Sequence, residues 1–111
     1  MSGGIAFSTT FGVFGIRIGS GTGHMIYYNS VNLYGLLPGT ANSSLLSAAL
    51  CIVATTSTGC DMRNNILTNT ITGGTTSIAQ VSVYMPTGGT SAMNLTWNNN
   101  AYYNGSDAAR Q

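Results

Sequence analysis

The chain has 111 residues, enough for one domain, and only 5% of them are charged. There is no Lys or Glu, and the net charge of +1 provides no basic field for capturing nucleic acid or an anionic membrane surface, so neither partner is expected. The hydrophobic content of 43% argues against disorder, and no apolar run is long enough for a membrane-spanning helix.

Short apolar runs that alternate with polar residues at period two predict strands along the whole chain. In chain order these runs fall at 15–18, 25–35, 49–52, 61–73, 80–83 and 94–105. Good helix formers are scarce, because Gly, Thr, Ser and Asn make up 53 residues. Only Ala41–Leu50 suits a short helix, and it equally suits a loop that leads into a strand. The sequence therefore predicts an all-β fold.

Two kinds of segment recur in a fixed order and define three cycles. The first is a short apolar alternation, which returns 34 residues after Ile16 at Leu50 and 31 residues later at Val81. The second is a longer segment with Asn in its middle, which returns at intervals of 35 residues from Asn29 to Asn64 and on to Asn99. A β-sandwich or jelly roll is the alternative, but it does not explain why both segment types return together.

Each cycle reads as one strand, a loop, and two strands that meet at an Asn, which is the plan of one coil of a right-handed parallel β-helix. We predict a single solenoid domain over residues 1–111, with coils at about 12–46, 47–79 and 80–105. Like strands would stack about 4.8 Å apart. Arg17, Cys51 and Ser82 should point outward, between two inward columns that consist of Ile16, Leu50 and Val81, and of Ile18, Ile52 and Val83.

The Asn residues of the longer segments are expected at the bends between strands, because Asn tolerates left-handed backbone. Stacked amides can also bond to one another from coil to coil. The expected bend residues are Asn29, Asn64, Asn65 and Asn99. Their register is open by one residue. Asn29 aligns with Asn64 if the hydrophobic residues two positions after each Asn are matched. It aligns with Asn65 if the hydrophobic residues three positions before each Asn are matched.

A resemblance to a known family lies in the segments GHMIYYNSVNLYG, CDMRNNILTNTITGG and NNNAYYNG. They resemble the right-handed parallel β-helix repeat proteins of the pectate-lyase-like superfamily, in particular large bacterial secreted or cell-surface proteins with many coils. The resemblance covers about residues 12–105 and implies an extracellular or cell-surface location, although no signal peptide is visible. It does not specify a function, because the same solenoid carries lyases, hydrolases, adhesins and inert stalks.

Carboxylates are too few for the enzymes of that superfamily, which cluster several of them. Asp61 and Asp107 lie 46 residues apart, and the single His24 follows a Gly-rich stretch without a nucleophile motif. We therefore predict no catalytic residue, no metal ligand and no cofactor, and we expect His24 to close a loop. Asp61 and Arg63 should form a surface ion pair on one strand. A lyase or hydrolase fragment is the least favoured function.

The two cysteines, Cys51 and Cys60, leave two possibilities open. A disulfide between them would close a short loop and would suit a secreted protein. Alternatively, both remain as unpaired thiols. Either role is structural, because a zinc site would need more ligands than two cysteines and one histidine.

The leading functional hypothesis is a non-catalytic structural module that associates end to end, because three coils leave two bare sheet ends. The expected partner is another copy of the chain, stacked head to tail, or the flanking coils of a parent protein. The alternative is a carbohydrate-binding module in which exposed aromatic rings stack on sugars. Its expected stacking residues are Tyr27, Tyr34, Trp97, Tyr102 and Tyr103.

Overall fold

The computed structural model describes residues 8–9, 12–38, 45–74, 79–89 and 91–105. Over these ranges the chain forms eleven strands and one short 3-10 helix, η1 (Ser91–Met93), and all strand pairs are parallel. The prediction of an all-β chain is confirmed. The short helix was not predicted.

Like strands from successive repeats lie side by side in four sheets. Sheet A contains β1 (Gly12–Ile18), β5 (Leu46–Ile52) and β9 (Ala79–Tyr84), and sheet B contains β2 (Met25–Tyr27), β6 (Asp61–Arg63) and β10 (Thr96–Asn98). Sheet C contains β3 (Ser30–Leu33), β7 (Ile66–Asn69) and β11 (Ala101–Tyr103), and sheet D pairs β4 (Leu36–Leu37) with β8 (Thr72–Gly73).

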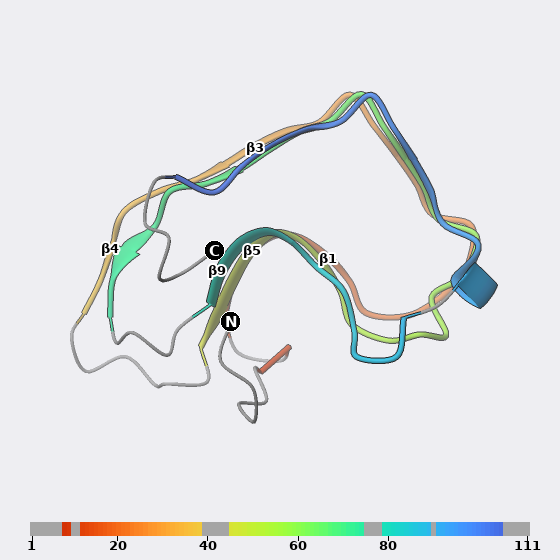
Figure 1. The fold of residues 1–111 in the computed structure, drawn as a ribbon, viewed down its shortest axis with the longest axis horizontal. Coiled ribbons are helices and arrows are strands. Elements are labelled where there is room, and N and C mark those ends of the chain that lie inside the picture. Colours follow the sequence, from red (N-terminus) through yellow and green to blue (C-terminus); the bar gives the residue numbers. More distant parts are fainter. Residues whose placement is uncertain (1–7, 10–11, 39–44, 75–78, 90, 106–111) are drawn as a thin grey trace.

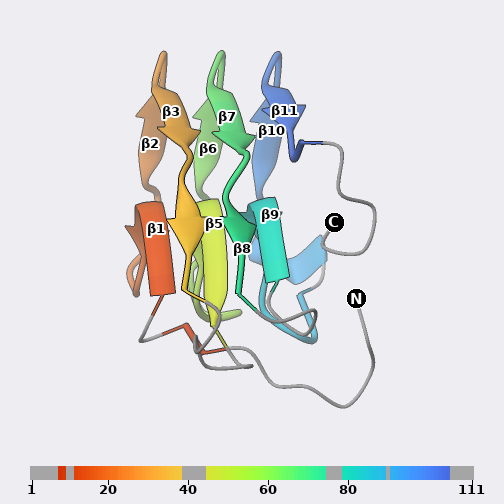
Figure 2. The same cartoon turned by 90° about the vertical axis from the view of Figure 1, so that its left-hand side faces the viewer.

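The chain visits sheets A, B and C in the same order three times, and the first two rounds also add a strand to sheet D. We call β1–β4, β5–β8 and β9–β11 the first, second and third pass. Figure 1 shows the three passes overlying one another, and Figure 2 shows them side by side. The main apolar cluster lies between sheets A, B and C, with Leu50, Met62 and Leu67 fully buried in the second pass. These side chains are buried because the second pass has a neighbour on both sides.

The register of sheet A confirms the predicted columns in the first two passes and corrects them in the third. Ile16 pairs with Leu50 and Ile18 pairs with Ile52, as expected. Leu50, however, pairs with Val83 and not with Val81, so the third pass is shifted by two residues. Such a shift preserves the period-two alternation, and the apolar pattern alone therefore could not detect it.

A narrow place in the interior determines the observed register. A Cβ on Gly15 would overlap Val31 of sheet C and the carbonyl of Ala49, so sheets A and C approach closely there. With Leu50 opposite Val83, the small Ser82 follows Gly15 and Ala49 at this place. The predicted register would have placed the bulkier Gln80 there. Close packing between two sheets thus decides the pairing.

The predicted outward column is corrected in its third member, because Tyr84 and not Ser82 aligns with Cys51. Arg17 is exposed on the outer face of sheet A, where its Nε donates to the carbonyl of Thr9 at 2.7 Å. Cys51 is fully buried in a second apolar cluster, together with Leu46, Ala48 and Ala79. Ser82 is buried as well, and its Oγ donates to Asn104 Oδ1 at 2.6 Å.

The bend between sheets B and C is two residues long in every pass, at 28–29, 64–65 and 99–100. The first of the two residues is left-handed each time, with φ of 57° at Tyr28, 57° at Asn64 and 55° at Asn99. The assignment of Asn64 and Asn99 to this conformation is therefore correct. Asn29 does not adopt it. Tyr28 does so instead, although such a backbone costs a side chain of this kind about 1–2 kcal/mol.

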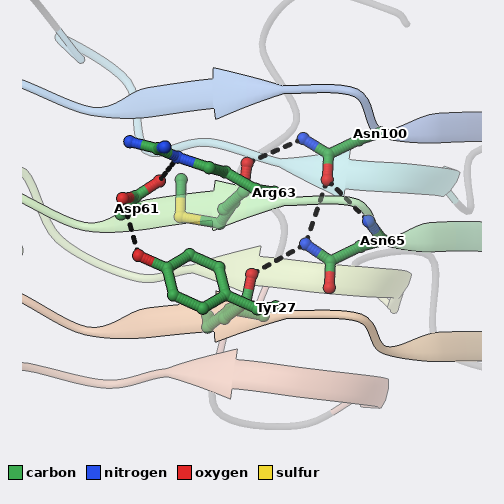
Figure 3. Close-up of polar contacts among 7 residues, drawn as sticks. Tyr27, Asp61, Arg63, Asn65 and Asn100 are labelled. Carbon is green, nitrogen blue, oxygen red and sulfur yellow. Dashed lines mark hydrogen bonds and ion pairs between the residues drawn. The ribbon is translucent and has the colours of Figure 1, made fainter.

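The second residue of each bend forms a ladder of asparagine amides, and Figure 3 shows its step from Asn65 to Asn100. Asn65 Oδ1 accepts from the backbone N–H and the Nδ2 of Asn29 at 3.0 and 3.1 Å. Asn100 Oδ1 accepts from the same two groups of Asn65, both at 3.0 Å. Nδ2 of Asn65 also donates to the carbonyl of Ile26 at 2.9 Å. Asn29 therefore matches Asn65, which resolves the register that the sequence left open, and Asn100 completes the set.

The connections between sheets A and B differ in length from pass to pass. They comprise residues 19–24, 53–60 and 85–95, the last of which contains η1. The bends between sheets B and C keep one length, because the ladder requires the same geometry each time.

We predict that Ile52→Ala lowers the free energy of unfolding by about 2–5 kcal/mol, because it empties a fully buried site in the second pass. Arg17→Ala, on the exposed face of the neighbouring strand, should cost less than about 1 kcal/mol. Urea unfolding measures the two free energies, provided that both variants show the same slope of free energy against urea concentration. A larger loss for Arg17→Ala would contradict the assignment of the two faces.

We also predict that Asn65→Ala lowers the free energy of unfolding by about 2–5 kcal/mol. The change leaves the N–H of Asn29 and the carbonyl of Ile26 without their partner at a buried site. Asn98→Ala is the matched control, because Asn98 is exposed on β10. Equal urea midpoints for the two variants would show that the ladder does not stabilise the fold.

Candidate functional site

A cluster of polar side chains on the outer face of sheet B joins the first two passes (Figure 3). Asp61 and Arg63 alternate with the buried Met62 on β6, so both project outward. Tyr27 is aligned with Arg63 on the neighbouring strand β2. Its hydroxyl donates to Asp61 Oδ2 at 2.7 Å, and Arg63 Nε donates to Asp61 Oδ1 at 2.6 Å. The predicted ion pair is confirmed, and Tyr27 is an additional partner.

The two hydrogen bonds change the acidity of all three groups. The pKa of Asp61 lies below its ordinary value, chiefly because Tyr27 donates to the carboxylate and also because Arg63 does. The pKa of Tyr27 is raised, chiefly by the same hydrogen bond, and the pKa of Arg63 is raised by its bond to Asp61. The stabilisation from Asp61 is therefore present above about pH 4 and is lost as the pH falls through its lowered pKa. The stabilisation from Tyr27 is lost as the pH rises through its raised pKa.

A shallow depression of about 240 Å³ adjoins this cluster at the bend towards sheet C. It is lined by Tyr27, Tyr28, Arg63 and Asn64. The ring of Tyr28 is 81% exposed. The depression thus combines two phenol rings with a guanidinium and an amide.

The second candidate feature is a cavity of about 320 Å³ at the third pass. The strand register aligns Trp97 with Met62 and Tyr102 with Leu67, two residues that point into the apolar interior. Both aromatic side chains are partly exposed there, whereas their second-pass counterparts are fully buried. The cavity is lined by Val81, Ser82, Val83, Trp97, Tyr102 and Asn104. Among the described residues, this cavity lies where the apolar interior ends at the third pass.

The five predicted sugar-stacking residues do not form one surface. Trp97 and Tyr102 belong to the inner columns of the third pass, whereas Tyr103 is aligned with Thr68. Tyr27 and Tyr34 belong to the first pass, and Tyr34 follows β3 on the far side of sheet C. Trp97 and Tyr102 line a common cavity. The sequence pattern alone could not assign the faces on which these residues lie.

The possible disulfide is not formed, and both cysteines are free and buried. Cys60 belongs to the apolar cluster between the sheets, whereas Cys51 packs in the cluster on the other face of sheet A. The two thiols therefore point to different sides of a sheet. Burial raises the pKa of Cys51, which disfavours its reactive thiolate.

His24 occupies the loop before β2, where it is exposed and its Nε2 lies 2.8 Å from the carbonyl oxygen of Ser20. It thus closes the loop, as expected. Asp107 lies outside the described residues. In the part of the chain that the structure describes, no three His, Cys, Asp or Glu side chains gather around a common point for a metal ion. The same residues contain no helix that is long and apolar enough to cross a membrane.

Comparison of the chain with protein-family models, with curated proteins and with solved structures finds no match.

We predict that Tyr27→Phe raises the pKa of Asp61 towards its ordinary value, because the variant removes the larger of the two hydrogen bonds that stabilise the carboxylate. A titration of the carboxyl carbon by NMR measures this shift. Tyr34→Phe is the control and should leave the titration of Asp61 unchanged. An unchanged curve in Tyr27→Phe would contradict the contact.

Proposed function

We propose that the chain is a three-coil module of a right-handed parallel β-solenoid, and that it serves a non-catalytic, structural role in a secreted or cell-surface protein by associating end to end. The support for the solenoid is the repeated order of sheets and the uniform parallel pairing of like strands. The resemblance of the Asn-bearing segments to β-helix repeats points the same way. The proposed partner is a second copy of the chain.

The observation that carries this proposal is the open interior at the third pass. The inner columns end there on Val83 and Trp97, which line the cavity and are only partly buried. At the opposite edge, the same columns begin with Ile16 and Ile26, which are also only partly buried. Stacking the first pass of one copy on the third pass of another would cover both apolar ends.

The asparagine ladder supports the same orientation. In each step the backbone N–H of one pass donates to the Oδ1 of the next, from Asn29 to Asn65 and from Asn65 to Asn100. A further pass beyond the third would accept from Asn100 in the same way. In a head-to-tail stack, Asn29 of the next copy would occupy that place. Such a contact is heterologous and does not close, so it should give fibres or short open oligomers.

We predict that Val83→Lys reduces self-association. An ammonium group at this inward position can reach solvent through the open end of one copy, but stacking would bury it against an apolar edge. Sedimentation velocity over a concentration series measures the change, and circular dichroism with urea unfolding establishes that the variant is folded. Wild type should form larger species as the concentration rises, whereas Val83→Lys should remain smaller at the same concentrations.

Asn98→Lys is the matched control in the same pass. Asn98 shares an outer column with Arg63, which carries a cation between two paired neighbours. A charge in that column is thus compatible with pairing, and Asn98→Lys should associate like wild type. A wild-type chain that remains monomeric at high concentration would contradict self-association and favour flanking coils of a longer chain as the partner.

A further inference from the structure

The left-handed residue of the first-pass bend departs from the pattern of the other two. In the second and third passes this position is Asn, which tolerates a positive φ, but in the first pass it is Tyr28 with φ of 57°. Its side chain is 81% exposed, so burial does not offset the strain. Strained residues of this kind concentrate at functional sites. The strained and exposed position of Tyr28 therefore suggests that its ring serves a function other than stabilising the fold.

The surroundings of Tyr28 combine a depression with polar groups. Tyr28 lines the depression of about 240 Å³ together with Tyr27, Arg63 and Asn64. The hydrogen bond from Tyr27 to Asp61 holds the first ring in place before any ligand arrives. Among the described residues, Arg63 uses only Nε for Asp61, so its terminal nitrogens are available as donors. Asn64 lies on the same rim.

The charge balance of this site selects against acidic ligands. Asp61 and Arg63 form an ion pair at 2.6 Å, and no other charged side chain lines the depression among the described residues. Because Asp61 already balances the charge of Arg63, an anionic ligand would gain little net attraction and would be repelled by the nearby carboxylate. Hydroxyl groups, in contrast, can accept hydrogen bonds from Arg63 and Asn64 without disturbing the ion pair. Flat apolar faces can stack on the exposed phenol ring.

We propose that this depression is a binding site for neutral carbohydrate, in which Tyr28 stacks on a sugar ring and Arg63 and Asn64 hold its hydroxyl groups. The site is on the outer face at the bend between sheets B and C, and the end cavity is lined by a different set of residues. Because the depression is lined by residues of the first two passes, it is complete within one copy, and carbohydrate binding can be measured on the unassociated chain.

Tyr28→Asn separates binding from folding. The variant gives the first pass the residue of the other two bends, so its melting temperature should equal or exceed that of wild type. Its affinity for cellohexaose, a neutral chain with flat sugar faces, should fall by at least about tenfold. Isothermal titration calorimetry measures the affinity at a protein concentration where sedimentation shows a single species. Tyr28→Gly is a second variant that also accepts the left-handed backbone and removes the ring.

Tyr34→Asn is the matched control, because Tyr34 is 76% exposed in the same pass but does not line the depression. It should bind cellohexaose like wild type. In an NMR titration, shifts should centre on residues 27, 28, 63 and 64. The proposal fails if cellohexaose does not bind, if the Tyr28 variants bind unchanged, or if the shifts centre on Trp97 and Tyr102. Tighter binding of oligogalacturonate than of cellohexaose would overturn the preference for neutral sugars.

Discussion

The hydrogen bonding of one buried amide, that of Asn65, is the constraint on which the arrangement of sheets B and C depends. Its oxygen accepts from Asn29, and its nitrogen donates to Asn100 and to the carbonyl of Ile26. Because Asn65 is only 1% exposed, water cannot replace these partners. Each pass must therefore turn at the same height and with the same backbone. This places Tyr27 directly beside Arg63, so the outer polar cluster is a consequence of the ladder.

Much of the fold could be predicted from the sequence, because it depends on features that recur. The strands, the cycle length and the asparagine bends leave a periodic signal that a single pass cannot provide. The register of the third pass was predicted wrongly because a shift by two residues leaves alternation intact. The feature that fixes it is steric. Only the folded chain shows that Gly15 faces Val31 across a narrow interior.

The candidate site was less accessible to prediction. The Asp61–Arg63 pair follows from spacing on one strand, and the structure confirms it. The contact of Asp61 with Tyr27 spans 34 residues and requires the register between two passes. The same holds for Asn100, whose partner Asn65 lies 35 residues earlier. The left-handed backbone of Tyr28 was equally hidden, because Tyr is not a residue that ordinarily signals this conformation.

The unequal connections between sheets A and B also have a consequence for how such a chain can diversify. At 19–24, 53–60 and 85–95 the chain leaves one sheet and enters the next through segments of different length, without change in the paired strands around them. The two-residue bends between sheets B and C allow no such latitude, since one inserted residue would move an amide out of the ladder. The corner where the chain enters sheet B can therefore accumulate insertions and new loops, while the corner where it leaves sheet B preserves the spacing of every repeat.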